Sequence, residues 1–369
     1  MKILGMILAG GNSKKMGGLT SRRATSAMPV GGSYRAIDFA LSNMSNSQVA
    51  KVAVITQYSS RSLNEHLSSS KWWDFGRKQG GLFVFNPTIT QNNNEWYRGT
   101  ADALAQNINF LKDSHEPYVA IAAGDGVYKL DYNDLLEYHI AKDADITVVC
   151  KEMPQGTDVS RFGVVTLAAD GRIEGFEEKP VNSNLNTVSC GIYLIRRRLL
   201  ITLLEECIEN DWYDFVRDIL TRQRSEKKIY AYMLKGYWAN IATKKAYFDC
   251  NMDFLKPEIR EELMYSEPEI QTKVDDNPPA KYNPGSHVTN SLVSTGTILN
   301  GAVDNSVVFK RAFIGSNCRI SNCIVMNDVY IGDNTVLEYC IVDTRTRIPS
   351  GTVNQGTKDD LHVILRREV

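Results

Sequence analysis

The feature that most constrains the fold is a repeat in residues 285–369. Similar segments begin at positions 297, 314, 331 and 348, so that one follows another every 17 residues, and the segment at 288 resembles the second half of a repeat. Within a repeat, an aliphatic or small residue recurs about every six positions, with Gly or Asn at the corners. This is the hexapeptide pattern of a parallel β-helix, in which each coil contributes three short strands.

The repeat also assigns a role to two cysteines. Cys323 and Cys340 occupy equivalent positions in successive repeats, so we expect them to stack as neighbouring core residues without chemistry of their own. The flat sides of such coils often serve as assembly surfaces, and the repeat therefore predicts an oligomer.

The first 250 residues have a different pattern, in which short apolar runs alternate with amphipathic stretches. We expect strands at 52–56, 118–123, 146–150, 164–167 and 191–195, and helices at 101–111, 133–142 and 199–208. This βαβ alternation predicts an α/β domain with a mixed, mostly parallel sheet, whose ligands bind at the carboxyl ends of the strands. Residues 267–284 combine prolines and charges without an apolar period, so we place domains at 1–266 and 285–369 with a linker between them.

The composition excludes several classes of function. The 42 basic and 43 acidic side chains of the 369 residues give a net charge of −1, which offers no overall attraction to nucleic acid or to a membrane. The seven cysteines lack C-x-x-C spacing, which favours reduced thiols over a disulfide framework or a zinc site. With no apolar run near ~18 residues and a strand pattern from the start, the sequence predicts a cytoplasmic protein.

A candidate phosphate loop follows the apolar run at residues 3–8. Gly10 and Gly11 end this run, and Lys14, Lys15, Arg22 and Arg23 follow as possible counter-charges. Glycines at the end of a strand allow backbone N–H groups to approach a phosphate chain, although Gly-Gly is also a common tight turn. The spacing matches neither the dinucleotide fingerprint nor the P-loop.

Asp125 is a candidate metal ligand because it follows the expected strand 118–123 and Gly124. Its carboxylate should lie at the carboxyl edge of the sheet, level with the phosphate loop, where it could hold Mg²⁺ against a nucleoside triphosphate. The alternative is that Gly-Asp-Gly is simply a turn.

Two further segments carry polar groups near expected strand or helix ends. Trp96 and Tyr97 precede Gly99 and Thr100 at a helix start, where they offer aromatic faces and hydroxyls to a nucleotide or merely cap the helix. Arg35 and Asp38 likewise could form a charge pair at a helix start or shape a substrate loop.

A last candidate site combines a base, a cation and a small hydroxyl. Glu178, Lys179 and Ser189 are groups of the kind that hold a sugar phosphate.

Taken together, the sequence resembles the ADP-glucose pyrophosphorylases, the glucose-1-phosphate adenylyltransferases of bacterial glycogen synthesis. The resemblance covers nearly the whole chain. Its best-matching segments are LTSRRA at 19–24, GGSYRAIDFALSN at 31–43, ITQY at 55–58, WYRGTADA at 96–103, SRFG at 160–163, FEEKP at 176–180 and GIY at 191–193.

This resemblance implies a Rossmann-like nucleotidyltransferase domain followed by a left-handed β-helix, in tetramers. Members of the family join ATP and glucose 1-phosphate into ADP-glucose and pyrophosphate, with Mg²⁺ held by two aspartates. The sugar phosphate attacks the α-phosphate in line, and catalysis consists mostly of positioning and charge neutralisation.

The chain departs from the family pattern in the phosphate loop. Where the family has G-G-x-G-[ST]-R-L and then R-A-K-P-A, this chain has Ser13 for glycine, Lys15 for arginine, Thr25 for lysine and Ser26 for proline. Replacing Arg with Lys loses a bidentate phosphate contact, and replacing Lys with Thr removes a charge.

The metal site departs as well. The family's G-D-H-I-Y keeps its aspartate here as Asp125 but loses the histidine to Gly126, and its Y-W-R-D-V-G-T has Asn240 in place of the second aspartate. A neutral amide is a poorer Mg²⁺ ligand than a carboxylate, so we expect a weak or absent metal site.

The sugar-phosphate residues, in contrast, match the family. This combination is similar to the non-catalytic D-type subunit that some Gram-positive bacteria make beside a catalytic pyrophosphorylase subunit. It implies a regulatory subunit in a heterotetramer with a catalytic paralogue, open to a sugar phosphate or nucleotide effector. The alternatives are an active adenylyltransferase with Asp125 as its only carboxylate ligand, and a guanylyl- or other nucleotidyltransferase of the same fold.

Overall fold

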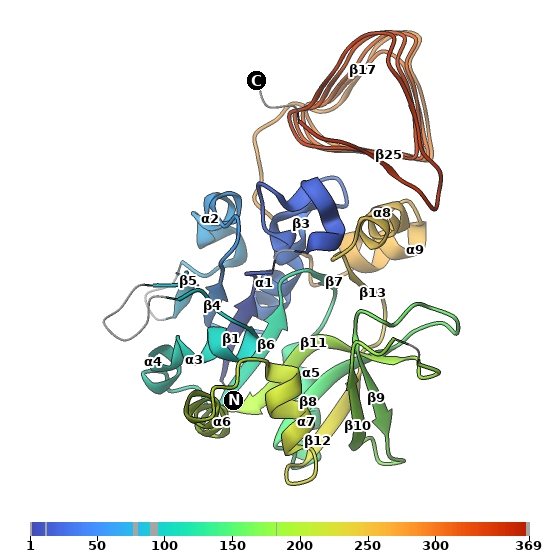
Figure 1. The fold of residues 1–369 in the computed structure, drawn as a ribbon. Coiled ribbons are helices and arrows are strands. Elements are labelled where there is room, and N and C mark those ends of the chain that lie inside the picture. Colours follow the sequence, from blue (N-terminus) through green and yellow to red (C-terminus); the bar gives the residue numbers. More distant parts are fainter. Residues whose placement is uncertain (1, 12, 77–79, 89–94, 182, 367–369) are drawn as a thin grey trace. The chain divides into compact units, whose positions relative to one another are not determined.

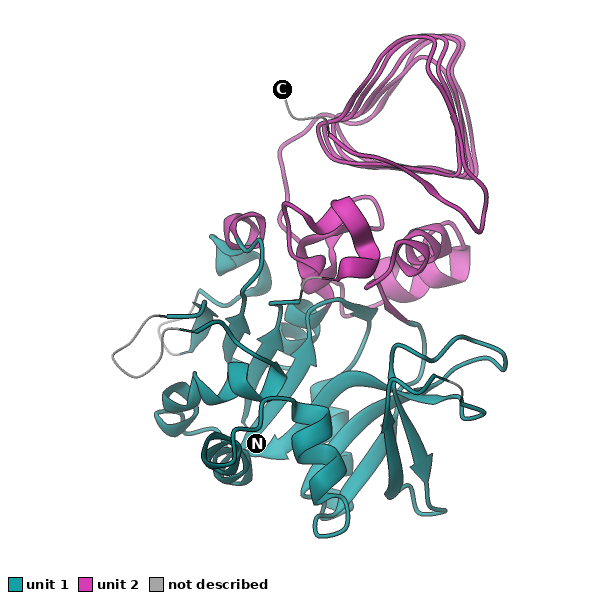
Figure 2. Cartoon of the chain, viewed as in Figure 1, with its two compact units in different colours: residues 1–11, 40–60, 67–238 teal, residues 12–39, 61–66, 239–369 magenta. Residues whose placement is uncertain are grey.

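The computed structural model describes residues 2–11, 13–76, 80–88, 95–181 and 183–366. The chain divides into two compact units, coloured separately in Figure 2. Unit 1 contains Met1–Gly11, Ala40–Ser60 and Leu67–Trp238, and unit 2 contains Asn12–Phe39, Arg61–His66 and Ala239–Val369. Three elements run from one unit into the other, namely α1 (Ala36–Asn46), α2 (Arg61–Leu67) and β13 (Trp238–Asn240).

The described part of unit 1 is built on a nine-stranded mixed sheet. Along the sheet the strands run in the order β10-β9-β11-β6-β1-β4-β5, while β8 pairs with β11 and β12 pairs with β8 (Figure 1). The central strands β6, β1, β4 and β5 are parallel, and β11 runs antiparallel to β6. The strands are β1 (Ile3–Leu8), β4 (Lys51–Ile55), β5 (Gly81–Phe85), β6 (Tyr118–Ala123), β8 (Ile146–Glu152), β9 (Gly163–Leu167), β10 (Ile173–Glu178), β11 (Thr187–Arg196) and β12 (Ile229–Met233).

Helices pack against this sheet with their apolar residues at helical spacing. In α6 (Arg197–Glu209) the buried residues are Leu200, Leu203, Leu204 and Cys207, which lie on one face. The other elements are β7 (Gly126–Tyr128), η3 (Ser70–Trp73), α3 (Thr100–Ala105), α4 (Ile108–Lys112), α5 (Tyr132–Ala141), the π-helix η4 (Phe215–Leu220) and α7 (Thr221–Gln223).

The prediction of one helix over 101–111 was wrong, because the structure has two helices there. Asn107 interrupts them with φ −107° and ψ 20°. Its side-chain amide donates to the carbonyl oxygen of Ala103 at 2.8 Å and to the hydroxyl of Tyr97 at 3.1 Å. Asparagine competes in this way with the backbone bonds of a helix.

Unit 2 begins with short elements and ends with stacked coils. The short elements are η1 (Lys14–Thr20), η2 (Thr25–Ala27), β2 (Pro29–Val30), β3 (Tyr34–Arg35), α8 (Lys244–Asp253), α9 (Pro257–Arg260) and the π-helix η5 (Glu261–Tyr265).

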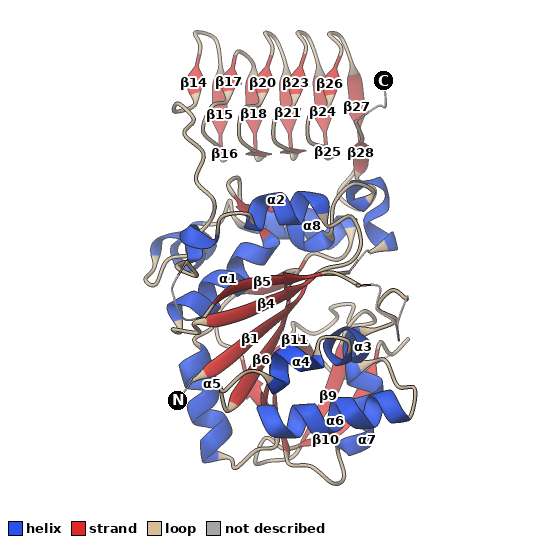
Figure 3. Cartoon of the chain, turned by 90° about the vertical axis from the view of Figure 1, so that its left-hand side faces the viewer, coloured by secondary structure: helices blue, strands red, loops and turns tan. Residues whose placement is uncertain are grey.

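The coils form three parallel sheets of five strands each within the described residues. They give a triangular cross-section in Figure 1 and stacked columns of strands in Figure 3. The first sheet has β14 (Lys281–Tyr282), β17 (Ile298–Leu299), β20 (Phe313–Ile314), β23 (Tyr330–Ile331) and β26 (Arg347–Ile348). The second has β15 (His287–Thr289), β18 (Ala302–Asp304), β21 (Arg319–Ser321), β24 (Val336–Glu338) and β27 (Val353–Gln355). The third has β16 (Leu292–Val293), β19 (Val307–Val308), β22 (Ile324–Val325), β25 (Cys340–Val342) and β28 (His362–Ile364).

The predicted fold class, a mixed-sheet α/β domain followed by a parallel β-helix, is therefore confirmed. The proposed boundaries 1–266, 267–284 and 285–369 stay a prediction, and residues 1 and 367–369 lie outside the described part of the chain. In that part, no helix is long and apolar enough to cross a membrane.

The 17-residue register holds for most of the coils but was wrong at the start of the first aligned repeat. Ile331 pairs with Ile348, and Ile320 pairs with Leu337, each pair 17 residues apart. Leu299, rather than residue 297, pairs with Ile314. The turn between β17 and β18 is two residues shorter than the turn between β20 and β21, and this difference shifts the strand.

Core residues and corners of the coils stack in separate columns. Cys340 N lies 3.5 Å from Cys323 Sγ, and both thiols are buried, so the predicted stacking of these cysteines is confirmed. At the corners, Asn305 and Asn322 adopt left-handed φ angles of 42° and 51°. The side-chain amide of Asn305 donates to that of Asn322 at 2.6 Å. Asparagine tolerates this conformation and links one coil to the next.

The outer side of the third sheet is also apolar. Val307, Ile324 and Ile341 are fully buried, although strand alternation turns them away from the inside of the coils. Other parts of unit 2 cover this side: Leu292 of β16, which pairs with Val307, packs so closely on Gly32 that a Cβ added there would lie 2.5 Å from Leu292 Cδ2. The outer face of the third sheet is therefore buried and not exposed to solvent.

We expect Ile320→Asp to destabilise the β-helix, because Ile320 is 1% exposed and the carboxylate would have no partner inside the coils. The loss should be about 3–5 kcal/mol, measured by chemical denaturation and accompanied by loss of any oligomer on size exclusion. Val353→Asp is the control, since Val353 is 62% exposed in the same domain. Equal stability of the two variants would contradict the assignment of core rungs.

A pH dependence follows from His139 in α5, which is 1% exposed and bonds Thr147 Oγ1 through Nδ1 at 2.8 Å. Burial lowers its pKa to about 4, and the charge of Arg196 adds to this effect. The unfolded chain takes up a proton near pH 6.5, so stability present above that pH is lost as the pH falls toward 4.

The loss should reach about 3 kcal/mol at most. His139→Gln should flatten this part of the stability–pH curve, whereas His115→Gln, at an exposed position, should leave it unchanged. Identical slopes for wild type and His139→Gln would show that the histidine does not contribute.

Candidate functional site

The carboxyl edge of the unit 1 sheet brings together the two loops that the sequence singled out. Strands β1 and β6 are parallel neighbours, with Leu8 opposite Ala123. Gly124 N donates to Leu8 O at 2.9 Å. Gly10 and Asp125 each follow their strand by two residues, so they lie at the same edge, as the strand pattern predicted.

Gln57, which the sequence analysis did not select, joins the next strand to this edge. Its side-chain oxygen accepts from Tyr97 N at 2.9 Å and its amide donates to Tyr97 O at 3.2 Å. A Cβ added to Gly10 would lie 3.1 Å from Gln57 Cβ, so only glycine fits this approach without a shift. The position of Gln57, two residues beyond the buried strand β4, was the available signal.

Gly99 and Thr100 have structural partners of their own. A Cβ on Gly99 would lie 2.3 Å from the carbonyl oxygen of Tyr213, so a larger residue would displace that segment. The Thr100 hydroxyl accepts from Phe215 N at 2.9 Å. These contacts fix the start of α3 against η4, and Gly99 caps α3 without a side-chain hydrogen bond. The nucleotide role of Gly99 and Thr100 stays a prediction.

The predicted sugar-phosphate residues lie on adjoining strands. Glu178 ends β10 and pairs with Lys179 Nζ at 2.5 Å, and Lys179 has a left-handed φ of 50°. Ser189 in β11 is buried, and its hydroxyl accepts from Gly191 N at 3.3 Å. Burial raises the pKa of Tyr193, which also hydrogen-bonds Ser189 and feels the charge of Glu178. The group is thus assembled at one end of β9, β10 and β11.

Three further predicted nucleotide and metal positions, Lys15, Thr25 and Asn240, belong to unit 2, whereas Gly11 follows Gly10 in unit 1. Lys15 is exposed in η1, and Thr25 is 3% exposed in η2. Asn240 Oδ1 accepts from Ala242 N at 3.0 Å, and the hydroxyl of Ser13 donates to the carbonyl oxygen of Ala242. Two residues that depart from the family pattern are therefore bound to one residue of their own chain.

These side chains do not fit a magnesium site with two aspartates. The amide oxygen of Asn240 carries no charge and is engaged by a backbone N–H. Among the described residues, no group of three or more His, Cys, Asp or Glu could hold a metal ion.

Unit 2 also contains a basic pocket of about 490 Å³, which the sequence analysis missed. Nine cationic side chains line it, against the four carboxylates of Glu65, Asp275, Asp328 and Asp343. The cations are Arg22, Arg23, Arg35, Arg61, Lys273, Lys310, Arg311, Arg345 and Arg366. This excess of positive charge favours an anion with several oxygen atoms.

One wall of the basic pocket is a column of coil corners. Arg311, Asp328 and Arg345 follow one another every 17 residues, with left-handed φ angles of 56°, 60° and 60°. Arg311 holds Asp328 through two bonds of 2.6 and 3.1 Å, and Arg345 lies 3.8 Å from the same carboxylate. The repeat spacing is the signal from which this column could have been predicted.

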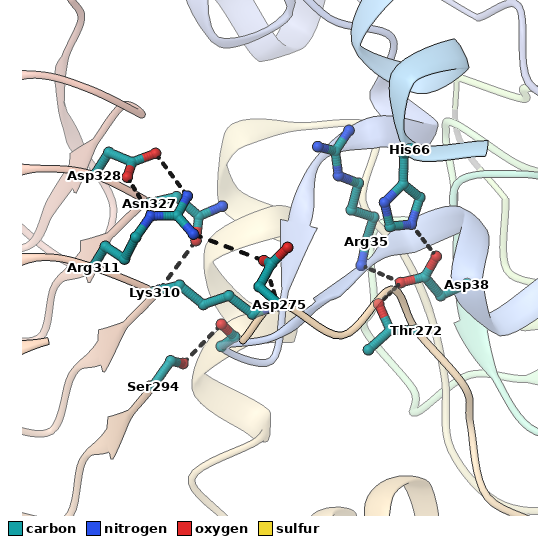
Figure 4. Close-up of polar contacts among 11 residues, drawn as sticks. Arg35, Asp38, His66, Thr272, Asp275, Ser294, Lys310, Arg311, Asn327 and Asp328 are labelled. Atoms are coloured by element: carbon teal, nitrogen blue, oxygen red, sulfur yellow. Dashed lines mark hydrogen bonds and ion pairs between the residues drawn. The ribbon is translucent and has the colours of Figure 1, made fainter. Parts of the chain in front are cut away.

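Arg35 provides a second wall, and its guanidinium does not pair with Asp38. It donates to the carbonyl oxygen of Ser62 at 2.8 Å and to the Ser62 hydroxyl at 3.0 Å. In Figure 4 the guanidinium points away from Asp38, and no carboxylate of the described residues forms an ion pair with it. Burial lowers the pKa of Arg35, with Asp38 acting in the opposite direction.

The carboxylate of Asp38 is fully buried and organises the start of α1 instead. It accepts from Arg35 N at 2.8 Å and from Thr272 Oγ1 at 2.5 Å, and it bonds His66 Nε2 at 2.6 Å (Figure 4). The charge-pair alternative for Arg35 and Asp38 is therefore wrong, whereas their position at a helix start is confirmed.

Comparison with known proteins identifies the class of protein. Residues 4–257 match the nucleotidyl transferase family, and residues 278–360 match the GlmU-like, C-terminal hexapeptide family. With the mixed sheet and the stacked coils, these matches place the chain in the nucleotidyl transferase family, with a hexapeptide β-helix at its C-terminal side.

Individual relatives make the assignment narrower. A glucose-1-phosphate adenylyltransferase of Thermotoga maritima is 40% identical over 314 residues, which cover 84% of this chain and 74% of the relative. That of Clostridium acetobutylicum is 39% identical over 323 residues, covering 87% and 85%, and that of Clostridium perfringens is 38% identical over 317 residues, covering 85% and 80%. The chain belongs to the glucose-1-phosphate adenylyltransferase, or ADP-glucose pyrophosphorylase, family, as the sequence motifs predicted.

The basic pocket should bind inorganic phosphate, and Arg345→Gln should weaken that binding about tenfold because a charged contact is lost. Binding is measured as the rise in melting temperature with phosphate concentration, against chloride at equal ionic strength. Arg319→Gln, an exposed change on another side of the same β-helix, is the control. Equal responses in the two variants would show that phosphate binds elsewhere.

Proposed function

We propose that this chain is a regulatory, catalytically deficient subunit of glucose-1-phosphate adenylyltransferase. The enzyme makes ADP-glucose and pyrophosphate from ATP and glucose 1-phosphate in bacterial glycogen synthesis. In this proposal the chain assembles with a catalytic paralogue into a heterotetramer and modulates the activity of that paralogue.

The observation that carries the proposal is that Ser13 and Asn240 both form hydrogen bonds with Ala242 of the same chain. By family resemblance, the first position is a glycine of the phosphate loop and the second is a magnesium-binding aspartate. Here both side chains form hydrogen bonds with Ala242. The loop that contains Ser13 and the segment around Asn240 are therefore held together without a nucleotide or a metal ion. An aspartate at position 240 would offer a charged ligand, whereas the amide offers a neutral oxygen that is already engaged.

The basic pocket supports an allosteric part of this role. An anion that binds one quaternary state better than another shifts the equilibrium between them, and a subunit without chemistry of its own can act in this way. The pocket lies within unit 2 and includes corners of the β-helix, the kind of surface on which we expect assembly. A phosphorylated sugar or a nucleotide has the chemistry to bind there.

The second candidate is an active adenylyltransferase that relies on Asp125 as its only carboxylate ligand. The arrangement of Glu178, Lys179 and Ser189 favours it, because this group is assembled as a sugar-phosphate site would require. Under the first proposal, the same group binds a ligand without turning it over.

We expect the purified chain alone to form ADP-glucose at least ~10²–10³-fold more slowly than the catalytic paralogue, because several charged contacts are missing from one site. Effects of groups that act in one site are not additive, so the individual losses do not multiply. Mixing the two chains should give a complex with altered activity or effector response, measured against the paralogue alone. Turnover by this chain comparable to that of the paralogue would favour the second candidate.

A further inference from the structure

The segment that precedes the β-helix contributes two residues to the basic pocket and is anchored by hydrogen bonds before and after them. We call residues 270–278 the strap. Thr272 bonds the buried Asp38 at 2.5 Å, and Pro278 O accepts from Gly296 N at 2.7 Å. Between these anchors, Lys273 and Asp275 line the pocket. Neither anchor involves the side chain of Asp275.

Asp275 places a carboxylate on the cations of the pocket wall. Its Oδ2 lies 3.2 Å from Lys310 Nζ and 3.8 Å from Arg311 Nη1. Figure 4 shows the Asp275 carboxylate beside these two side chains. The side chain of Lys310 is only 12% exposed, and Asp275 is its one acidic partner among the described residues. Arg311 already holds Asp328 through two bonds, so Asp275 is not needed to neutralise it.

We propose that Asp275 is a built-in competitor for the anion that the basic pocket binds, which adds a means of regulation to the function proposed above. A phosphate group of the ligand takes the place of the carboxylate on Lys310 and Arg311. It has the advantage in this exchange, because it carries nearly two negative charges and three acceptor oxygens where the carboxylate carries one charge. The ligand thereby releases the side-chain contact that holds the middle of the strap.

The difference in exposure between Asp275 and Lys310 favours a competing role for Asp275 over simple neutralisation of Lys310. Asp275 is 39% exposed, so its carboxylate can leave for solvent at small cost, whereas Lys310 stays enclosed. The strap keeps its anchors at Thr272 and Pro278 after the exchange. Without a ligand, the carboxylate of Asp275 thus occupies the anion position in the pocket. Only an anion that competes successfully with Asp275 changes this state.

The test compares Asp275→Asn with Asp276→Asn in the purified full chain. Both changes remove one negative charge, but Asp276 is exposed and does not line the pocket. Inorganic phosphate is the probe, titrated calorimetrically at constant ionic strength. Asp275→Asn should bind phosphate about tenfold more tightly than wild type, because a like charge beside the ligand is gone, and Asp276→Asn should bind as wild type does.

A second variant locates the effect. When Lys310→Gln is combined with Asp275→Asn, the tighter phosphate binding of Asp275→Asn should be lost. The cation for which phosphate and the carboxylate compete is then absent. Normal binding by wild type without a gain in Asp275→Asn, or an equal gain in Asp276→Asn, would overturn the competition while leaving the regulatory proposal in place. Wild type and Asp275→Asn both failing to bind phosphate would overturn the anion pocket itself, and the subunit-mixing assay would still decide the regulatory role.

Discussion

The register of the stacked coils is the constraint on which unit 2 depends. Its strands are two or three residues long, far too short to be stable alone, so each is held by backbone bonds to the coils before and after it. Parallel stacking places like positions above one another. The aliphatic side chains of Ile314, Ile331 and Ile348 therefore form one continuous column, and so do the corners at which the chain must turn.

The same register that builds the core also builds one wall of the basic pocket. Because the corners repeat with the coils, Arg311, Asp328 and Arg345 stand one coil apart, with charges that alternate along the column. A cation within a packed domain needs a nearby anion or an equivalent ligand. In this pocket the ion pair of Arg23 with Asp343, at 2.8 Å, meets that need within the chain. The partners of Arg61, Lys310, Arg311 and Arg345 are exposed or shared carboxylates.

In unit 1 the corresponding constraint is the parallel pairing of β6, β1 and β4. Parallel strands end at one edge, so the residues that follow them are brought together whatever their separation in sequence. Gly10, Gln57 and Asp125 meet there for this reason. The edge persists although the chain departs from its family elsewhere, because strand pairing depends on the buried apolar residues of the sheet and not on the ligand-binding side chains.

The sequence by itself determined the features that rest on period and local chemistry. The spacing of 17 residues specified the coils and the stacking of Cys323 on Cys340, since side chains in a parallel stack repeat with the chain. Apolar runs followed by glycine marked the ends of β1 and β6, just before Gly10 and Gly124. Family motifs then indicated the positions at which this chain departs from the family pattern.

Only the tertiary structure decided which of these residues meet. It joined Ser13 and Asn240 at Ala242, split the helix expected over 101–111, and turned the guanidinium of Arg35 to Ser62. The basic pocket likewise gathers side chains from segments up to 344 positions apart, from Arg22 to Arg366. Such contacts depend on how distant segments pack, and no local period or propensity encodes a distance between them.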